Sequence, residues 1–167
     1  SLKQPKGDVL FKDVMFGYEP EKRILDGVSF HARPGETVAL VGPTGAGKTV
    51  VAAACAFLAW ENGCQSALMA PTELLAQQHL KTMETLLGHT GMKIALLTGS
   101  MTVAQKRRCR EALETGEIDL IVGTHALLSE GVEFRRLGLV ITDEQHRFGV
   151  GQRSKLSAKG DDPHLLV

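Results

Sequence analysis

The sequence predicts an α/β fold, with a mainly parallel sheet between two layers of helices and an antiparallel edge formed by its first two strands. Short apolar segments alternate with helical segments along the chain, which is typical of parallel sheets. Several apolar segments are continuous rather than alternating, as strands buried on both faces require. No repeat, low-complexity tract or linker divides the 167 residues, so we expect a single domain over 1–167.

The N-terminal part of the chain is predicted to contain three strands and one helix. Residues 9–16 and 24–31 have the composition of strands, and the segment between them, with its glycine and proline, indicates a turn. Residues 37–41 form a compact β-rich run that stops at a glycine. Residues 49–60 contain many alanines and no turn signal, so they predict a helix.

The remainder of the chain alternates regularly between the two kinds of element. Helices are predicted over residues 73–87 and 103–114. The predicted strands cover residues 66–69, 93–97, 118–122, 137–141 and 164–167.

Composition and charge narrow the classes of function. Nineteen basic and nineteen acidic residues cancel, so no global field attracts the protein to nucleic acid or membrane. Cys55, Cys64 and Cys109 lack the spacing of metal ligands and indicate free thiols in a reducing compartment. The longest apolar run, residues 50–60, is too short to span a bilayer. We therefore expect a cytoplasmic protein, if the chain is natural, with no membrane partner.

The clearest motif is a phosphate-binding loop. It fits the pattern G-x-x-x-x-G-K-[ST] and stands between a predicted strand and a predicted helix, the context that gives the pattern its meaning. Its glycines let successive N–H groups point at phosphate oxygens, and the positive end of the helix adds to them. A glycine-rich turn with a chance Lys-Thr pair is the weaker alternative. The predicted nucleotide-binding residues are Gly42, Pro43, Thr44, Gly45, Ala46, Gly47, Lys48 and Thr49.

Two residues of this loop have chemical roles beyond main-chain contact. Lys48 can reach the β- and γ-phosphates of a nucleotide, and it is a candidate catalytic residue. The hydroxyl of Thr49 can hold Mg²⁺. The motif therefore predicts ATP or ADP together with Mg²⁺ as the bound species and places the chain among the P-loop NTPases.

A pair of acids follows the strand predicted at 137–141. Asp143 and Glu144 would lie at the carboxyl edge of the sheet, where open α/β sheets bind their ligands. One carboxylate there can bind Mg²⁺ through water, and the next can orient an attacking water. Two solvated turn acids are the alternative, and the phosphate loop favours the site. We assign Asp143 to the metal and Glu144 to the candidate catalytic base.

Four segments carry a resemblance to a known family. They read APTELLAQQH at 70–79, LTGS at 97–100, VGTHAL at 122–127 and DEQHRFG at 143–149. With them, residues from about 50 to the end resemble the first motor domain of RecG-type branch-migrating DNA helicases of superfamily 2. The resemblance implies that residues 71–73 and 123–125 lie along the backbone of a DNA strand.

The N-terminal part carries a different resemblance. Phe16-Gly17-Tyr18, the run ILDGVSF at 24–30 and the run PGETVALV at 34–41 make residues 7–49 resemble the start of an ABC transporter ATPase domain. In that family an aromatic residue before the phosphate loop stacks on the adenine, and Tyr18 occupies its place. A tyrosine packed against its neighbours is an equal alternative. Two resemblances that meet at the loop predict an engineered chimera, a recombinant product whose terminal serine fits an engineered end.

The sequence leaves three functions open. The first is a nucleotide-binding module with slow or no hydrolysis, because neither an ABC signature segment nor the helicases' second motor domain is found in the 167 residues. The alternatives are a DNA-dependent ATPase or helicase motor-domain fragment, and a fold-only scaffold that binds phosphate alone. Complete helicase or transporter activity is not expected, and an ATP-driven dimer is disfavoured, so we expect a monomer.

DNA binding is expected to be weak and sensitive to salt, because the net charge is zero. Lys106, Arg107, Arg108 and Arg110 add local positive charge. For these residues a solvated helix face is the stronger alternative.

Overall fold

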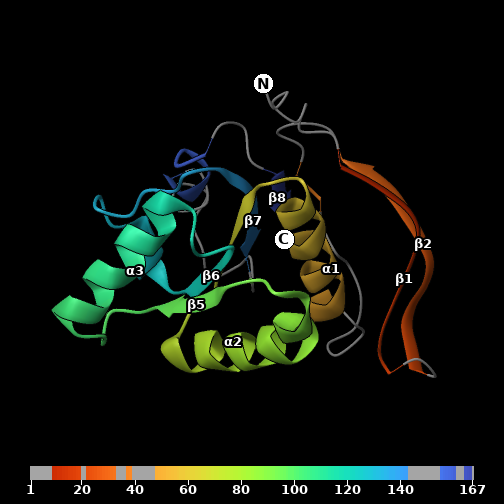
Figure 1. Cartoon of the computed structure of the whole chain (residues 1–167), viewed down its shortest axis with the longest axis horizontal. Helices are drawn as coiled ribbons and strands as arrows, with labels where there is room; N and C mark the ends of the chain where they lie inside the picture. Colours follow the sequence, from red (N-terminus) through yellow and green to blue (C-terminus); the bar gives the residue numbers. More distant parts are fainter. Residues whose placement is uncertain are drawn as a thin grey trace.

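The computed structural model describes residues 9–19, 22–32, 37–38, 48–142, 155–160 and 164–166, and it describes side chains in 48–142 and 155–160. Its main sheet has six parallel strands in the order β3-β8-β7-β4-β6-β5 (Figure 1). The predicted α/β fold is confirmed. These strands are β3 (Thr37–Val38), β4 (Gln65–Met69), β5 (Ile94–Leu97), β6 (Leu120–Gly123), β7 (Leu137–Thr142) and β8 (His164–Leu166).

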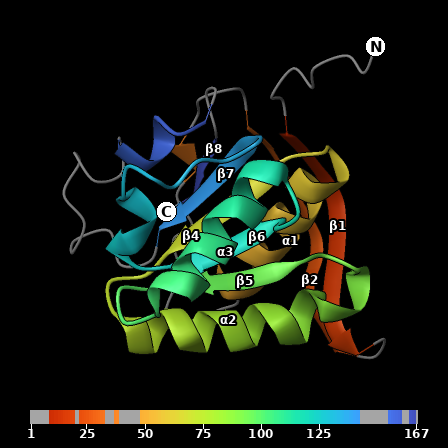
Figure 2. The same ribbon diagram turned by 60° about the vertical axis from the view of Figure 1, so that its left-hand side comes forward.

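The helices cover both faces of this sheet, which gives three layers (Figure 2). The helix α1 (Lys48–Glu61) packs with α2 (Glu73–Leu87) on one face, and α3 (Val103–Thr115) packs on the other. Two short 3-10 helices, η1 (Gly88–Thr90) and η2 (His125–Leu128), follow α2 and β6.

Alternate residues of the central strands supply the two cores, because successive side chains of a strand point to opposite faces. Leu68 and Leu120 belong to the core beneath α1 and α2. Their neighbours Ala67 and Ile121 belong to the core beneath α3. All four side chains are at most 2% exposed, as the continuous apolar runs predicted.

Small side chains let α1 lie close to the sheet. Ala53 and Ala56 are fully buried, and the helix has buried residues along most of its length. The hairpin of β1 (Val9–Glu19) and β2 (Lys22–Ala32) lies along α1, on the side away from the main sheet (Figure 1). A helix with apolar residues on more than one side is stable only when it is covered on those sides.

The hairpin corrects two expectations. It forms a separate two-stranded antiparallel sheet rather than an edge of the main sheet, because α1 stands between them. The turn was expected around Gly17, Glu19 and Pro20, but Gly17 and Glu19 belong to β1, and Pro20 lies outside the described residues. The pairing register between β1 and β2 shifts on both sides of Gly17. A glycine inside a strand often marks such a β-bulge.

Candidate nucleotide and nucleic-acid site

The predicted phosphate loop leads directly into α1. Lys48 is the first residue of α1 and is exposed, and Thr49 follows it and is half-buried. No acidic residue lies in the first turn of the helix, so no side chain of that turn neutralises its positive end. This end of α1 can therefore attract an anion. The other six loop residues, 42–47, lie outside the described residues, and their predicted role stays a prediction.

The predicted acidic pair follows the end of β7. Asp143 and Glu144 lie outside the described residues, but β7 ends at Thr142, directly before them. The side-chain oxygen of Thr142 is buried and makes no hydrogen bond within the described part of the chain. Because β3, β8 and β7 are adjacent and parallel, the segments that follow β3 and β7 leave the sheet at the same edge.

Two further predictions are not tested by the described residues. Tyr18 lies in β1, where only the backbone is described, so its contact with a base stays a prediction. Within the described ranges, no three His, Cys, Asp or Glu side chains come together as metal ligands. The predicted metal residues are Thr49 and Asp143, and only Thr49 lies in those ranges.

Three more segments leave the sheet at this carboxyl edge, and each contains a threonine that caps a helix. The side-chain oxygen of Thr72 accepts a hydrogen bond from the main-chain N–H of Leu75 at 3.2 Å. Thr102 caps α3 in the same way and forms a capping box with Gln105. Thr124 accepts from the N–H of Ala126 at 3.5 Å. Such caps fix where each helix begins, and so they fix the loops before them.

A carboxylate joins two of these segments. Glu73, at the start of α2, accepts hydrogen bonds from both the main-chain N–H and the hydroxyl of Ser100, at 3.0 and 2.8 Å. The hydrogen bond from the Ser100 hydroxyl lowers the pKa of the Glu73 carboxyl most, and the bond from the Ser100 N–H lowers it further. The nearby positive charges of His125 and Lys106 act in the same direction. Lys106 in turn donates from Nζ to the carbonyl of Gly99 at 2.7 Å.

The turn after β6 is held by a close approach of two main chains. A Cβ at Gly123 would lie 2.3 Å from the carbonyl oxygen of Leu97, so only glycine fits there. The carbonyl of Gly123 accepts from the N–H of Ala70 at 2.8 Å, and the N–H of Thr124 donates to Leu97 at 3.4 Å. Strands β4, β5 and β6 therefore end in one connected group of turns.

Residues 155–160, which follow the acidic pair in the sequence, contact the loop after η2. Lys159 donates from Nζ to the carbonyls of Ser129 and Val132, at 2.9 and 2.7 Å. Leu156, three residues earlier, is fully buried in the core beneath α3. These contacts attach residues 155–160 to the loop that follows η2.

The sequence pointed to residues 71–73 and 123–125 but did not predict the contact between Glu73 and Ser100. The two residues are 27 positions apart, and neither belongs to a pattern that pairs them. Two cues were present: a Thr-Glu pair at the start of a helix, and a Gly-Ser turn after a strand.

Comparisons with known proteins agree with this arrangement. The chain matches the DEAD/DEAH box helicase family over residues 26–160. It is 55% identical over 128 residues to the ATP-dependent DNA helicase RecG of Streptococcus pneumoniae serotype 4, covering 77% of this chain and 19% of that protein. It is 51% identical over 127 residues to RecG of Bacillus subtilis, covering 76% and 19%.

A solved structure gives the same result. The structure of RecG bound to a three-way DNA junction superposes with a TM-score of 0.66 at 37% identity, covering 80% of this chain and 18% of that one. The chain thus spans about a fifth of the length of these relatives. Among the described residues, no helix is long and apolar enough to cross a membrane.

These matches extend further toward the N-terminus than the predicted helicase-like segment. Residues 50–167 number 118, yet the RecG match covers 128 residues, so it must begin at least ten residues before position 50. The family match begins at residue 26. An ABC-like origin for residues 26–49 and a seam after the phosphate loop are therefore unsupported. Both families share a strand, loop and helix here, which is why the loop alone misleads. The chain belongs to the DEAD/DEAH box helicase family.

Proposed function

We propose that this chain is the first motor domain of a RecG-like helicase, which binds Mg²⁺-ATP or Mg²⁺-ADP and the backbone of a DNA strand. One observation carries the proposal: the segments that follow β3, β4, β5, β6 and β7 all leave one sheet at its carboxyl edge. In open α/β sheets that edge is where ligands bind.

The nucleotide would lie where the loop and the acidic pair meet. Lys48 is exposed at the start of α1, so its ammonium group is free to approach phosphate oxygens. The Thr49 hydroxyl and the Asp143 carboxylate are oxygen ligands of the kind that Mg²⁺ prefers. Bound Mg²⁺ would neutralise charge on the phosphates, and Glu144 would orient the water that attacks.

DNA would lie along the turns after β4, β5 and β6. Thr72, Ser100 and His125 are exposed there, and together they offer two hydroxyl groups and an imidazole. Groups of this kind contact phosphate and sugar rather than bases, so we expect little sequence preference. Because the formal net charge is zero, the affinity should be modest and should fall steeply with salt.

Hydrolysis by the 167-residue polypeptide alone is proposed to be slow. An arginine supplied by a second element accelerates phosphoryl transfer by about 10³–10⁵ in related enzymes. We therefore expect turnover well below about 1 per second, with no strand separation and no stimulation by DNA. Phosphate release measured with and without single-stranded DNA checks this, and a several-fold rise that is lost in Thr124→Ala would contradict it.

Calorimetric titration with ATP and ADP, with and without Mg²⁺, tests the proposal as a whole. Mg²⁺ should tighten binding to the parent chain, and Thr49→Val should remove that dependence because the hydroxyl is lost. Thr85→Val is the matched control, since Thr85 is exposed and bonds only within α2. Inorganic phosphate that binds as tightly as ATP would favour the scaffold alternative. No binding of either nucleotide would refute the proposal.

A finer proposal concerns the hairpin. Tyr18 lies before residue 26, where the family match begins, and we propose that it stacks on the adenine. Stacking on an aromatic side chain contributes about 1–3 kcal/mol. Tyr18→Ala should then bind ATP about five- to 150-fold more weakly, while Tyr18→Trp should match the parent. GTP should bind nearly as well as ATP. Equal affinity of the Ala variant, with the fold retained by circular dichroism, would exclude this contact.

A further inference from the structure

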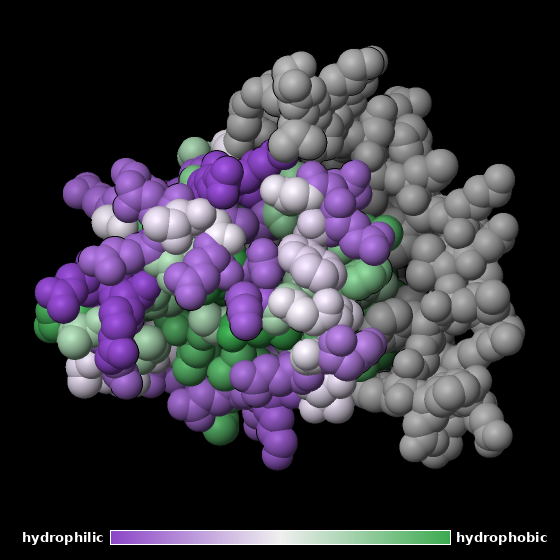
Figure 3. Space-filling model, viewed as in Figure 1, coloured by the Kyte–Doolittle hydropathy of each residue, from purple (hydrophilic) through white to green (hydrophobic). Residues whose placement is uncertain are grey.

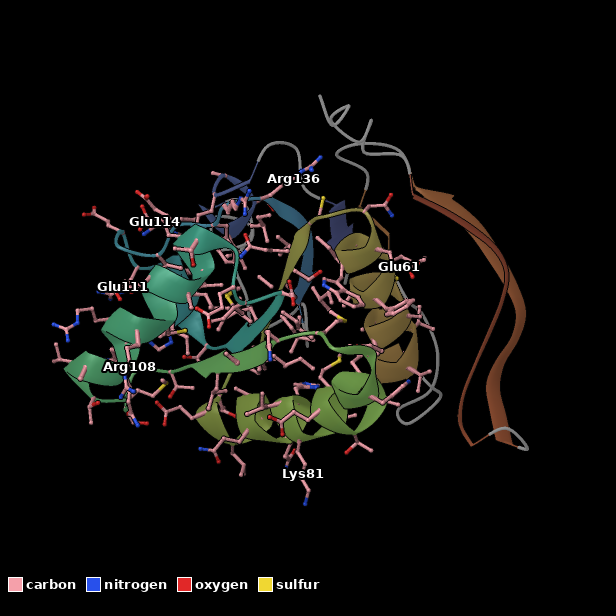
Figure 4. All side chains as sticks on the ribbon, viewed as in Figure 1. Glu61, Lys81, Arg108, Glu111, Glu114 and Arg136 are labelled. Atoms are coloured by element: carbon pink, nitrogen blue, oxygen red, sulfur yellow. The ribbon has the colours of Figure 1, made fainter. Side chains whose placement is uncertain are left out.

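The charged residues of α3 are divided along its length. Lys106, Arg107 and Arg108 lie in its first half, and the second half contains both acids, Glu111 and Glu114, together with one base, Arg110. Figure 4 shows Arg108, Glu111 and Glu114 in succession along the helix. Hydrophilic residues predominate on this side of the molecule, with apolar residues among them (Figure 3), and Val103 at the start of α3 is exposed.

This order is the reverse of the one that stabilises a helix. The positive end of the helix dipole lies at the N-terminus and favours acids there, and the negative end favours bases. The first turn of α3 has no acid and its last turn has no base. Arg107 precedes Glu111 by four residues, which is the weaker orientation for a pair within a helix. The stability of α3 therefore does not explain these charges.

Within the described part of the chain, Arg107 and Arg108 are also unpaired. Arg107 and Arg108 are exposed, and neither forms an ion pair or a hydrogen bond with another residue of the described part of the chain. Cys109 and Leu113 point into the core from the opposite side of the helix. The guanidinium groups are therefore available to a ligand in solution.

The basic half of α3 adjoins the carboxyl edge. The helix follows β5, so its first turn lies at the end of the sheet where β5 stops. Lys106 bonds to Gly99, and the next residue, Ser100, bonds to Glu73. Arg107 therefore directly follows Lys106, whose side chain is bonded to one of the proposed DNA-binding turns.

We propose that the first half of α3 is a second phosphate-binding surface, which extends the path of the DNA backbone beyond the turn at 98–100. The ligand is the DNA phosphate backbone, because guanidinium groups bind phosphate oxygens strongly and both arginines are exposed. Glu111 and Glu114 limit the surface, since their charge repels phosphate. This inference rests on the proposed function, because it requires DNA at the carboxyl edge.

The test is binding of fluorescein-labelled oligothymidylate to the 167-residue chain, measured by anisotropy over a range of salt concentrations. Arg107→Gln/Arg108→Gln removes two charges from the surface. Lys81→Gln/Lys93→Gln is the matched control, because both lysines are exposed and lie away from this edge, Lys81 on the outer side of α2 (Figure 4) and Lys93 before β5. The net charge of the two variants is the same.

The arginine variant should lose about tenfold in affinity at about 0.1 M salt, and its salt slope should fall by about 1.4, the value for two phosphate contacts on a single strand. The lysine variant should keep the slope of the parent. Arg107→Lys/Arg108→Lys should restore most of the affinity, and Glu111→Gln should bind more tightly than the parent. The melting temperature of the arginine variant should equal or exceed that of the parent, because the removed charges oppose the dipole.

Three results would overturn the proposal. Equal slopes for the arginine and lysine variants would show that only total charge matters. The proposal would also fail if Glu111→Gln and a folded arginine variant both bound the oligothymidylate as tightly as the parent does. The charged side of α3 would then be an ordinary solvated helix face. A parent chain that binds nucleotide but no DNA would refute this inference and the DNA part of the proposed function, while the nucleotide part would stand.

Discussion

The two ends of the parallel sheet use their polar side chains in opposite ways. At the amino end, the buried side chain of Gln65 donates to the carbonyls of Leu113 and Ile118 and accepts from the N–H of Arg136. At the carboxyl end, the half-buried Glu73 bonds to the exposed Ser100. The polar groups of Gln65 are therefore occupied by bonds within the fold, whereas the exposed Ser100 remains accessible to a ligand.

The same contrast extends to how each end is closed. Gln65 is 4% exposed, and its side chain links the residues just before β6 and β7 to the C-terminal part of α3. The carboxyl end is closed by helix caps and by the narrow approach at Gly123, which fix turns without covering them. Binding residues commonly lie on accessible loops that a rigid scaffold holds in place, and the two ends of this sheet fit that arrangement.

The largest effect should come from the amino end. Gln65→Met keeps the volume of the side chain but removes three hydrogen bonds, so the main-chain groups they satisfied lose those bonds. We expect a loss of about 2–4 kcal/mol in the free energy of unfolding, measured by urea denaturation. Gln78→Met, at an exposed position of α2, is the control and should change stability little. Equal destabilisation by both variants would mean that Gln65 has no special role.

An intermediate effect is expected from the core beneath α1. Burial raises the pKa of the Cys55 thiol from 9.0 to about 12. Because the folded state holds this proton more tightly, the contribution to stability is complete below pH 9 and is lost as pH rises from 9 toward 12. At about pH 10.5 the loss should be about 2 kcal/mol.

Urea denaturation at pH 8 and at about pH 10.5 measures this loss. In Cys55→Ala the component should disappear, so the difference between the two pH values should be smaller than in the parent. If the variant and the parent lose the same stability, Cys55 does not hold its proton in the folded state.

The smallest effect on stability should come from the carboxyl end. Glu73→Gln weakens a contact between a half-buried side chain and the exposed Ser100, so the unfolding midpoint should barely change, while affinity for single-stranded DNA should fall several-fold. The contact depends on the ionised carboxylate, whose pKa is lowered in the fold, so it is present above the ordinary value of 4.5 and is lost as pH falls through the lower folded pKa.

Glu84→Gln is the control for this variant, because Glu84 is an exposed acid on the same helix. It should leave DNA affinity unchanged or raise it slightly. A Glu73→Gln chain that binds DNA as the parent does, or that loses stability as Gln65→Met does, would break the distinction between the two ends.

Local signals were sufficient to predict most elements but not their arrangement. The run that became β6 is apolar, β4 ends in the apolar run 67–69, and the run after the loop is rich in alanine, so these elements follow from composition. The separation of the hairpin from the sheet depends on the position of α1, which is a tertiary effect. The sheet order β3-β8-β7-β4-β6-β5 likewise has no local signal.

The site divides in the same way. Lys48 and Thr49 were predicted because their motif is contiguous, and the structure places them at the start of α1. The pairing of Glu73 with Ser100 joins residues that only the fold brings together. Long-range polar contacts depend on the register of several elements at once, and no single segment encodes them.

The most direct test of the account is the affinity of Lys48→Ala for Mg²⁺-ATP, measured by calorimetry beside the parent. Lys48 is exposed at the first turn of α1, so its removal should leave the circular dichroism spectrum and the unfolding midpoint unchanged. We expect a loss of at least about tenfold in affinity, or more than about 1.4 kcal/mol. A folded Lys48→Ala chain that binds Mg²⁺-ATP as tightly as the parent would contradict a nucleotide site at this loop.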